Sequence, residues 1–301
     1  MDRVSEKSLA ATLLDRYGHL GITGLRETGR GLDARVYRGE SAALGPVAIR
    51  VPHARRLNDG NETQLDTRLQ LRQDFSLSRH LRASGLPVPE VFVLHTDGTG
   101  TGTDFTIAEY VSSDASVLPE SEFGGLIRAI HSIPAPRLDL VCMESSDDAD
   151  QVLSERIGDR LEKLAAITEV GVRFPDIHAA LAADRGDGLP RRLLHMDLRP
   201  ENILVRAGQP AAIIDWSNAL IGDPALDLAR AAEYGSLTPG ALAAYGDPGS
   251  FTMTPLTPRQ AVYRLDTAVM LSHVFLSDAP DQVRARHYVE RTRLLCCMIA
   301  S

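Results

Sequence analysis

Three polar residues at fixed spacing, His195, Asp197 and Asn202, form the pattern H-x-D-x-x-x-x-N, and Asp215 follows thirteen residues after Asn202. A carboxylate such as that of Asp197 can accept the proton of a hydroxyl group. The side-chain oxygens of Asn202 and Asp215 are hard ligands that suit Mg²⁺. A base, an amide ligand and a carboxylate ligand in one cleft are what phosphoryl transfer needs, because its catalysis depends on positioning and on charge neutralisation by metal.

The residues around this pattern predict a rigid frame for it. Short apolar runs lie on both sides of the pattern, and Asp215 stands at the end of the third run. Pro200 stiffens the loop between Asp197 and Asn202. The pattern therefore predicts a polar loop between short strands, with the later aspartate projecting from a strand end into the same cleft. The runs cover residues 193–194, 203–205 and 211–214.

This stretch resembles the catalytic region of the aminoglycoside phosphotransferase family, whose loop reads H-G-D-x-x-x-x-N and precedes I-D-[WF] and G-D-P-x-x-D-L-A. The chain reads H-M-D-L-R-P-E-N from His195, I-D-W around Asp215 and G-D-P-A-L-D-L-A from Gly222. The resemblance implies that Asp197 is the catalytic base and that His195 braces the loop. It also implies that Asn202 and Asp215 hold the magnesium ion.

Three departures from the family pattern lie beside the expected base. Met196 replaces the usual glycine, and Arg199 and Glu201 replace residues that are commonly small or histidine. None of them removes a group that the chemistry requires. They are placed to shape the acceptor site, and we expect Arg199 to contact the acceptor.

The resemblance covers most of the chain and implies an α+β, protein-kinase-like fold with two lobes. Residues 1–111 are expected to form a nucleotide-binding lobe with a small antiparallel sheet and one main helix. Residues 112–301 are expected to form a larger, mostly helical lobe for catalysis and acceptor binding. The residue pattern agrees, because β-prone runs gather in the first third of the chain and helical spacing dominates the rest.

The individual elements follow from apolar spacing and from turn residues. Strands are predicted at 21–27, 35–38, 46–51, 91–94 and 105–111. Helices are predicted at 5–20, 65–84, 123–131, 150–166 and 174–183, and over most of the chain from residue 224 onward.

A kinase-like small lobe needs a phosphate-covering turn and a cation on its third strand. A glycine-bearing turn predicted at 28–33 contains Gly29 and Gly31, which we expect to approach the phosphates; a plain hairpin turn is the alternative. The tetrad V-A-I-R, which ends at Arg50, resembles the family's V-A-I-K strand. The only lysines, Lys7 and Lys163, lie elsewhere, so Arg50 is the expected phosphate contact. An arginine fork binds phosphate oxygens in pairs and stays charged.

The acid that partners Arg50 is expected on the helix predicted at 65–84. Family sequences place this acid about three turns before the glycine that ends the helix, so the resemblance implies Asp74 here, and Asp66 is the second candidate. A plain surface acid is the alternative interpretation of Asp74.

The segment I-A-E-Y-V resembles the hinge between the lobes of the family's enzymes, where backbone groups bind the purine. It assigns Glu109, Tyr110 and Val111 to nucleotide binding. Because backbone atoms make these contacts, the side chains do not distinguish ATP from GTP. His131, at the end of the next predicted helix, is expected to be a packed structural residue.

The charge of the chain is unevenly distributed. The first lobe holds 14 cations and 14 acids, and the second holds 18 and 26, so the net charge of −8 belongs to the lobe that would bind the acceptor. This balance fits a cationic or polyhydroxyl acceptor, and a solvated acidic surface is the alternative. Glu233 and Asp266 are the expected acceptor contacts, with Asp278 and Asp281 as further candidates.

These patterns together predict an enzyme that uses Mg²⁺ and ATP or GTP to phosphorylate a hydroxyl of a small molecule. An antibiotic or another natural product is the leading acceptor, and a metabolic kinase for choline, homoserine or a sugar is the alternative. A nucleotide-binding pseudokinase is disfavoured by the intact polar pattern. A protein kinase is disfavoured because D-F-G and A-P-E are missing.

The composition of the chain limits which classes of partner are expected. The acidic pI, about 5.6, disfavours a nucleic-acid-binding surface. The sequence contains no apolar run of membrane-spanning length and no apolar signal core near Met1, so a cytoplasmic protein is expected. No obligate protein partner is implied.

Overall fold

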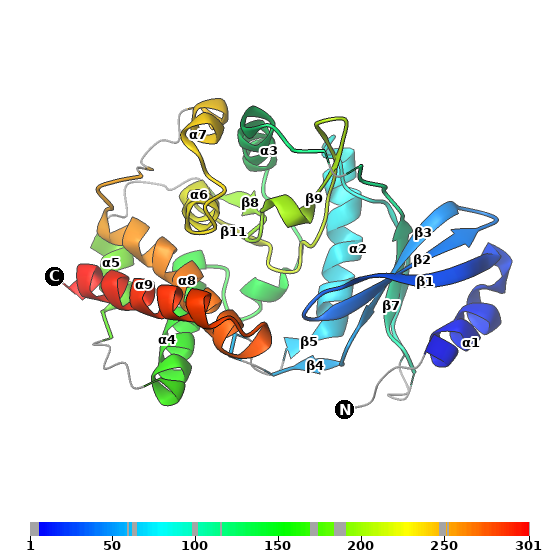
Figure 1. Ribbon diagram of the computed structural model, residues 1–301, viewed down its shortest axis with the longest axis horizontal. Helices are drawn as coiled ribbons and strands as arrows, with labels where there is room; N and C mark the ends of the chain where they lie inside the picture. Colours follow the sequence, from blue (N-terminus) through cyan, green and yellow to red (C-terminus); the bar gives the residue numbers. More distant parts are fainter. Residues whose placement is uncertain are drawn as a thin grey trace.

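The computed structural model describes residues 6–58, 60–61, 65–97, 102–114, 116–168, 174–183, 191–246, 251 and 253–300. Figure 1 shows two parts side by side, a sheet flanked by helices and a larger helix-rich part. The expected α+β, two-lobed architecture is confirmed. The lobe boundary expected after residue 111 falls in the segment between the last strand of the sheet and the first helix of the larger part.

The described part of the small lobe contains a five-stranded antiparallel sheet in the order β1-β2-β3-β7-β6. Arg50, on the central strand β3, lies opposite Val36 on one side and Thr106 on the other. The strands are β1 (Ile22–Arg30), β2 (Ala34–Ser41), β3 (Gly45–Pro52), β6 (Val91–His95) and β7 (Phe105–Glu109), and β4 (Arg56–Leu57) pairs separately with β5 (Leu65–Asp66).

Alternation along β3 decides which way Arg50 faces. Val47, Ile49 and Val51 are buried and share a hydrophobic core with leucines of α1 (Glu6–Tyr17). Successive strand residues point to opposite faces, so Arg50 faces away from that core. Figure 1 shows α1 and α2 (Thr67–Ala83) on opposite sides of the sheet, and α2 lies on the side toward the larger lobe.

Sequence signals define both ends of α2. The Asp66 carboxylate accepts a hydrogen bond from the Arg68 backbone N–H, as an N-cap residue does. At the other end Gly85 adopts φ 84°, and the Leu86 N–H donates to the Leu81 carbonyl at 3.1 Å. This is a Schellman motif, which needs a residue that tolerates the left-handed conformation. The prediction that Gly85 ends this helix is therefore correct.

The larger lobe is built around α8, which is buried along almost its whole length. It contacts α4, α5, α6 and α9, and Figure 1 shows α9 lying beside it. No helix among the described residues is long and apolar enough to cross a membrane. The helices are α3 (Glu120–Ser132), α4 (Ala149–Ile167), α5 (Ile177–Ala183), α6 (Pro224–Glu233), α7 (Pro239–Tyr245), α8 (Pro258–His273) and α9 (Gln282–Ala300), with the short turns η1 (Gly18–Leu20), η2 (Val141–Met143), η3 (Pro200–Asn202) and η4 (Val274–Asp278).

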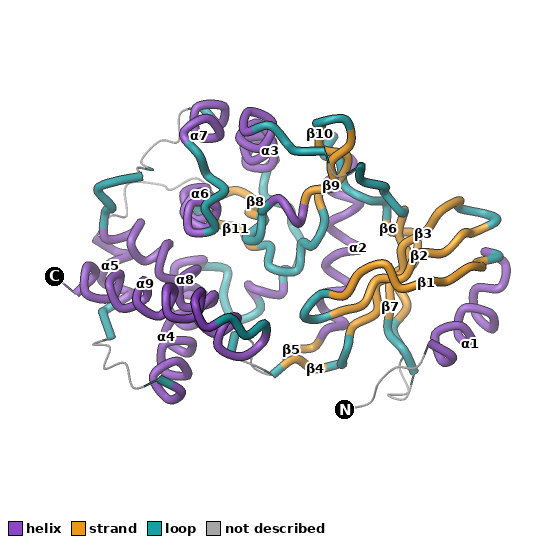
Figure 2. The backbone as a smooth tube through the Cα atoms, viewed as in Figure 1, coloured by secondary structure: helices purple, strands orange, loops and turns teal. Residues whose placement is uncertain are grey.

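Two short antiparallel pairs carry the polar pattern at the junction of the lobes, as the tube in Figure 2 shows. The predicted runs form β8 (Arg192–Leu194), β9 (Ile203–Arg206) and β10 (Gln209–Ile213). β11 (Leu220–Gly222), whose Leu220 pairs with Leu194, was not predicted from the sequence. It is only three residues long, which is too short for a periodic signal.

The glycine turn differs from its prediction. The expected turn at 28–33 begins later, because β1 continues to Arg30. Gly29 therefore lies within the strand, opposite Val36, and only Gly31 belongs to the turn. Cross-strand pairing with β2 overrides the weak strand propensity of glycine here.

Candidate active site

Asp197 lies in the loop between β8 and β9, and both oxygens of its carboxylate accept hydrogen bonds. The Tyr234 hydroxyl donates to Oδ1 at 2.5 Å, and the Asn202 amide donates to Oδ2 at 2.7 Å. The same amide donates to the Asp197 carbonyl at 2.8 Å, which closes the loop. Arg199 Nε lies 3.4 Å from Oδ2. The expected base, one expected metal ligand and Arg199 are thus in one cluster.

His195 connects this loop to the strand that precedes Asp215. Its ring is buried, and Nδ1 accepts the Asp197 backbone N–H at 3.2 Å. The proton therefore resides on Nε2, which donates to the Ile214 carbonyl at 3.1 Å. Burial lowers the pKa of His195 despite the surrounding carboxylates, so the ring stays neutral. This geometry suits a brace between two loops.

Asp227 holds the loop by its backbone. Its two carboxylate oxygens accept the His195 N–H at 2.8 Å and the Met196 N–H at 2.7 Å. Asp223 caps α6 and Pro224 takes its first position, which places Asp227 in the first turn of the helix, against the loop. Burial alone would raise the pKa of Asp227, but the hydrogen bond from His131 and the neighbouring groups hold it below its ordinary value.

Met196 needs this support because of its backbone conformation. It is fully buried and has φ 63°, in the left-handed region that favours glycine. The conformation costs a residue with a Cβ atom roughly 1–2 kcal/mol. The short hydrogen bond from its N–H to Asp227 helps to offset this cost. Met196 thus stands at the glycine position of the family pattern and keeps the left-handed backbone conformation that favours glycine.

We expect Asp227→Asn to destabilise the fold and lower activity. The asparagine side chain has one oxygen and one NH₂ group, so only one of the two buried backbone N–H groups keeps an acceptor. The other loses its hydrogen bond, which lowers the free energy of unfolding by about 1–3 kcal/mol. Urea denaturation would measure it. Asp223→Asn is the matched control, because asparagine caps a helix as well as aspartate does. If the Asp227→Asn protein is as stable as the control, Asp227 does not hold the loop through these two hydrogen bonds.

Arg50 lies between two carboxylates. Its Nη1 donates to Asp74 Oδ2 on α2, and its Nη2 lies 3.6 Å from Asp215 Oδ1. Burial opposes the charge of Arg50, but the two carboxylates raise its pKa above the ordinary value, so it stays cationic. Of the two acids considered for α2, the structure brings Asp74 to Arg50, whereas Asp66 caps the helix.

Asp215 follows β10 and has φ 65°, a second left-handed residue in the site. Its Oδ1 accepts a hydrogen bond from the Ser217 hydroxyl at 2.9 Å. Burial alone would raise its pKa, but the Arg50 guanidinium and this hydrogen bond hold the pKa of Asp215 below its ordinary value. The carboxylate is therefore ionised when it faces Arg50.

Gln73, the neighbour of Asp74, ties α2 to the segment after Asp215. Its side-chain amide donates to the Trp216 carbonyl at 2.5 Å and to the Ser217 carbonyl at 3.2 Å. Its side-chain oxygen accepts the Val141 N–H at 2.7 Å. The small-lobe helix is thereby fixed to the larger lobe at the point where Asp74, Arg50 and Asp215 meet.

Only some of the backbone N–H groups expected to contact the nucleotide are free to donate a hydrogen bond to it. The Glu109 and Tyr110 N–H groups already donate to the Glu90 and Pro46 carbonyls, at 2.8 Å and 3.1 Å. Within the described residues, the Val111 N–H makes no hydrogen bond, so it is the amide left for a purine. The Gly31 N–H donates to the Ala34 carbonyl, so that amide is not free for a phosphate either.

Two of the acids expected to contact the acceptor are not accessible to it. Glu233 is buried in ion pairs with Arg264 and Arg291, at 3.1 Å and 2.7 Å. Asp266 is 0% exposed and faces Arg156, Arg160 and Arg230. These contacts contradict the expectation drawn from net charge, because a summed charge does not reveal which acids are already neutralised inside the lobe. Asp281 instead caps α9, and Asp278 lies in η4.

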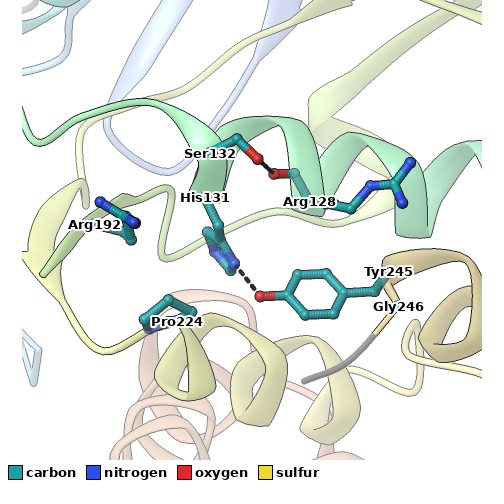
Figure 3. Close-up of a pocket in the computed structure, with 7 residues that line it drawn as sticks. All are labelled: Arg128, His131, Ser132, Arg192, Pro224, Tyr245 and Gly246. Atoms are coloured by element: carbon teal, nitrogen blue, oxygen red, sulfur yellow. Dashed lines mark hydrogen bonds between the residues drawn. The ribbon is translucent and has the colours of Figure 1, made fainter. Parts of the chain in front are cut away.

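His131 is a packed histidine, as expected. Its Nδ1 faces the Tyr245 hydroxyl at 3.1 Å and its Nε2 faces Asp227 Oδ2 at 3.2 Å. Figure 3 shows this ring beside Tyr245, in a cavity of about 370 Å³ that Arg128 and Arg192 also line. Asp197, Asn202 and Asp215 are not among the residues that line this cavity, which meets the site only where His131 contacts Asp227.

The oxygens that remain suit a magnesium ion. Among the described residues neither Asn202 Oδ1 nor Asp215 Oδ2 accepts a hydrogen bond. The Ile214 N–H donates to the Asn202 carbonyl at 2.9 Å, so the two ligand-bearing segments lie side by side. No group of three or more His, Cys, Asp or Glu side chains forms a metal site in the described part of the chain. Mg²⁺ ordinarily takes only one or two protein ligands and completes its shell with phosphates and water.

The fold is protein-kinase-like. Residues 24–258 match the profile of a phosphotransferase enzyme family, the aminoglycoside phosphotransferase family, and the chain belongs to this family. It is therefore an enzyme of the small-molecule phosphotransferase type. No curated protein sequence matches the chain.

Solved structures with this fold match along almost the whole chain. Aminoglycoside phosphotransferase APH(4)-Ia has a TM-score of 0.63 and 17% identity, over 99% of this chain and 100% of that one. A proposed fructosamine-3-kinase from Haemophilus somnus 129PT has a TM-score of 0.66 and 17% identity, over 98% and 97%. Macrolide 2′-phosphotransferase MphH from Brachybacterium faecium has a TM-score of 0.56 and 18% identity, over 95% and 98%. At these identities the similarity shows the fold.

Four residues that contact the site were given no role from sequence: Gln73, Asp227, Arg230 and Tyr234. Asp227 had a usable signal, because an acid in the first turn after G-D-P favours a helix start that faces the loop. Tyr234 and Arg230 had none, since their importance arises only where the end of α6 meets the loop around Asp197.

Proposed function

We propose that the chain transfers the γ-phosphoryl group of ATP or GTP to a hydroxyl of a small molecule. The observation that carries this proposal is the convergence of Arg50, Asp215, Asn202 and Asp197 from three separate segments, the last two residues sharing one loop. Solved relatives favour a nucleotide donor, because a thermostable APH(4)-Ia variant was crystallised with AMP-PNP and hygromycin B.

Each residue has a distinct proposed task. Asp197 accepts the proton of the acceptor hydroxyl, whose oxygen attacks the γ-phosphorus while the bond to the bridging oxygen breaks and the nucleoside diphosphate leaves. Arg50, fixed by Asp74, binds phosphate oxygens. His195 and Asp227 position the loop. Asn202 and Asp215 would hold Mg²⁺, which when bound would neutralise phosphate charge.

We propose a natural product such as an antibiotic as the acceptor. Arg199 is a partly exposed cation 3.4 Å from Asp197, and the acids Glu233 and Asp266 are neutralised inside the lobe. This favours a neutral or weakly charged polyhydroxyl compound over a strong polycation. A metabolic sugar kinase is the second candidate, since the fold is also that of the fructosamine-3-kinase-like protein.

A panel of hydroxyl compounds tests this function. It would contain aminoglycosides, macrolides, simple sugars, choline and homoserine, each with MgATP and with MgGTP. The proposal predicts acceptor-dependent release of nucleoside diphosphate and a product with the mass of a phosphate ester. Tight nucleotide binding without transfer to any member would favour the pseudokinase, and no nucleotide binding would contradict the proposal.

Arg50→Ala is expected to weaken nucleotide binding by about 10–100-fold, the equivalent of losing a charge-assisted contact. Arg50→Lys should recover most of the affinity, because it keeps a cation on the same strand. Titration calorimetry with MgATP would measure both variants. Arg26→Ala, an exposed arginine on β1, is the control. Equal affinities for Arg50→Ala and the control would show that Arg50 does not contact phosphate.

A further inference from the structure

Tyr234, directly after α6, makes a contact with Asp197 that the proposed chemistry does not use. Its hydroxyl lies 2.5 Å from Asp197 Oδ1. A carboxylate can only accept a hydrogen bond, so the tyrosine donates. Burial raises the pKa of Tyr234 above its ordinary value, which keeps this proton on the hydroxyl.

The tyrosine is held in this position by arginines. Arg230, one helical turn earlier, donates from Nε to the Tyr234 hydroxyl at 3.3 Å. The guanidinium carbons of Arg230 and Arg199 each lie 5.8 Å from the centre of the tyrosine ring. Arg230 is in turn fixed by Asp266 at 3.2 Å. The hydroxyl is therefore aimed at Asp197 by a chain of contacts that starts inside the lobe.

This contact has the geometry that an acceptor hydroxyl requires. A hydroxyl that gives its proton to a base must lie about 2.6–3.2 Å from a carboxylate oxygen. Tyr234 places a hydroxyl at Oδ1 within hydrogen-bond reach, while Oδ2 is bound by Asn202. Each oxygen of the base thus already accepts one hydrogen bond before any acceptor arrives.

We propose that the Tyr234 hydroxyl occupies the acceptor's place on Asp197 and suppresses transfer of the phosphoryl group to water until an acceptor displaces it. This inference rests on the proposed function. In the suppressed reaction a water oxygen would bond to the γ-phosphorus and give a proton to Asp197. The bond to the bridging oxygen would break, and the nucleoside diphosphate would leave with its electron pair. Tyr234 prevents the contact of this water with Asp197.

The position of Tyr234 allows such a displacement. It lies at the end of α6, and the next residue, Gly235, has φ 75° and begins the loop to α7. Tyr234 is partly exposed at this position, outside the buried core, so displacement of its side chain does not require the core to unpack. An acceptor that brings its own hydroxyl to Oδ1 replaces one hydrogen bond with another.

The test needs no knowledge of the acceptor. Release of phosphate from MgATP is measured without any acceptor for the wild type and for Tyr234→Phe, which loses only the hydroxyl. We expect about a tenfold rise in Tyr234→Phe, as befits loss of a hydrogen bond to a charged group. Tyr234→Leu should change in the same direction. Tyr288→Phe is the matched control, because its hydroxyl bonds only the Glu233 carbonyl at 3.2 Å. It should match the wild type.

The double variant Asp197→Ala/Tyr234→Phe links the rise to the base, and it should hydrolyse no faster than the wild type. Unchanged or slower hydrolysis in Tyr234→Phe, with nucleotide bound as tightly as before, would overturn the inference and leave Tyr234 a purely structural residue. A rise that persists in the double variant would also overturn it. Failure of the wild type to bind nucleotide in calorimetry would instead contradict the proposed function.

Discussion

Asp197→Ala is expected to lower the rate of phosphoryl transfer by about 10²–10⁴-fold, the usual contribution of a general base. The carboxylate is the group beside Asn202 that can accept a proton from a hydroxyl, and alanine leaves only the neighbouring donors Tyr234, Asn202 and Arg199. Nucleotide affinity should be unchanged or slightly tighter, because a negative charge near the phosphates has been removed. Steady-state rates with an acceptor from the panel, together with calorimetry, would separate the two effects.

Glu162→Ala is the matched control for this experiment. Glu162 is an exposed acid on α4, so its removal changes the net charge equally but leaves the loop intact. It should transfer phosphate at the wild-type rate. If Asp197→Ala binds nucleotide and keeps more than about a tenth of the wild-type rate, below the usual contribution of a general base, Asp197 is not the base.

Asp266→Ala is expected to lower the free energy of unfolding by about 3–5 kcal/mol, the cost of breaking a buried ion pair from one side. Arg156 binds the carboxylate through Nε and Nη2, at 2.8 Å and 2.7 Å. Arg160 and Arg230 each lie 3.2 Å away. Alanine would leave three arginines together in the lobe without their shared counter-charge. Urea denaturation followed by circular dichroism would measure the loss.

The pH dependence of this loss has a definite sign. Burial would raise the pKa of Asp266, but the three arginines outweigh it and hold the pKa below its ordinary value. A lowered pKa stabilises the fold fully above the ordinary carboxyl range, and the stabilisation disappears only as the pH falls below it. The deficit of Asp266→Ala should therefore be the same at about pH 6 and about pH 8.

Asp159→Ala serves as the surface control for Asp266. This exposed aspartate pairs with Lys163 at 2.9 Å on one helix, an interaction that contributes about 0.5 kcal/mol or less. A deficit for Asp266→Ala as small as that of the control would show that the arginines find other partners or water.

Local patterns predicted most of the site from sequence. The H-x-D-x-x-x-x-N spacing, the apolar runs beside it and the strand-end position of Asp215 each depend on residues close in the chain. Asp74 was predicted from the family spacing, counted back from Gly85, which does end the helix. These predictions did not require knowledge of how the two lobes pack against each other.

The residues missed at the site share one physical cause, which is that their roles depend on contacts between distant segments. Tyr234 meets Asp197 across 37 residues of chain, and Gln73 meets Trp216 across 143. Asp266 was predicted to contact the acceptor because its arginine partners, on α4 and α6, lie far away in the sequence. Net charge counts such acids as if they were exposed.

The central claim is that Asp197 directs the γ-phosphoryl group to an acceptor hydroxyl. A single-turnover reaction with γ-labelled ATP, Mg²⁺ and an acceptor from the panel, run for the wild type and Asp197→Ala, tests it most directly. The account predicts that the wild type moves the label into a phosphate ester on the acceptor, whereas Asp197→Ala binds the nucleotide and leaves the label on it. Labelled ester formed at equal rates by both proteins would contradict it.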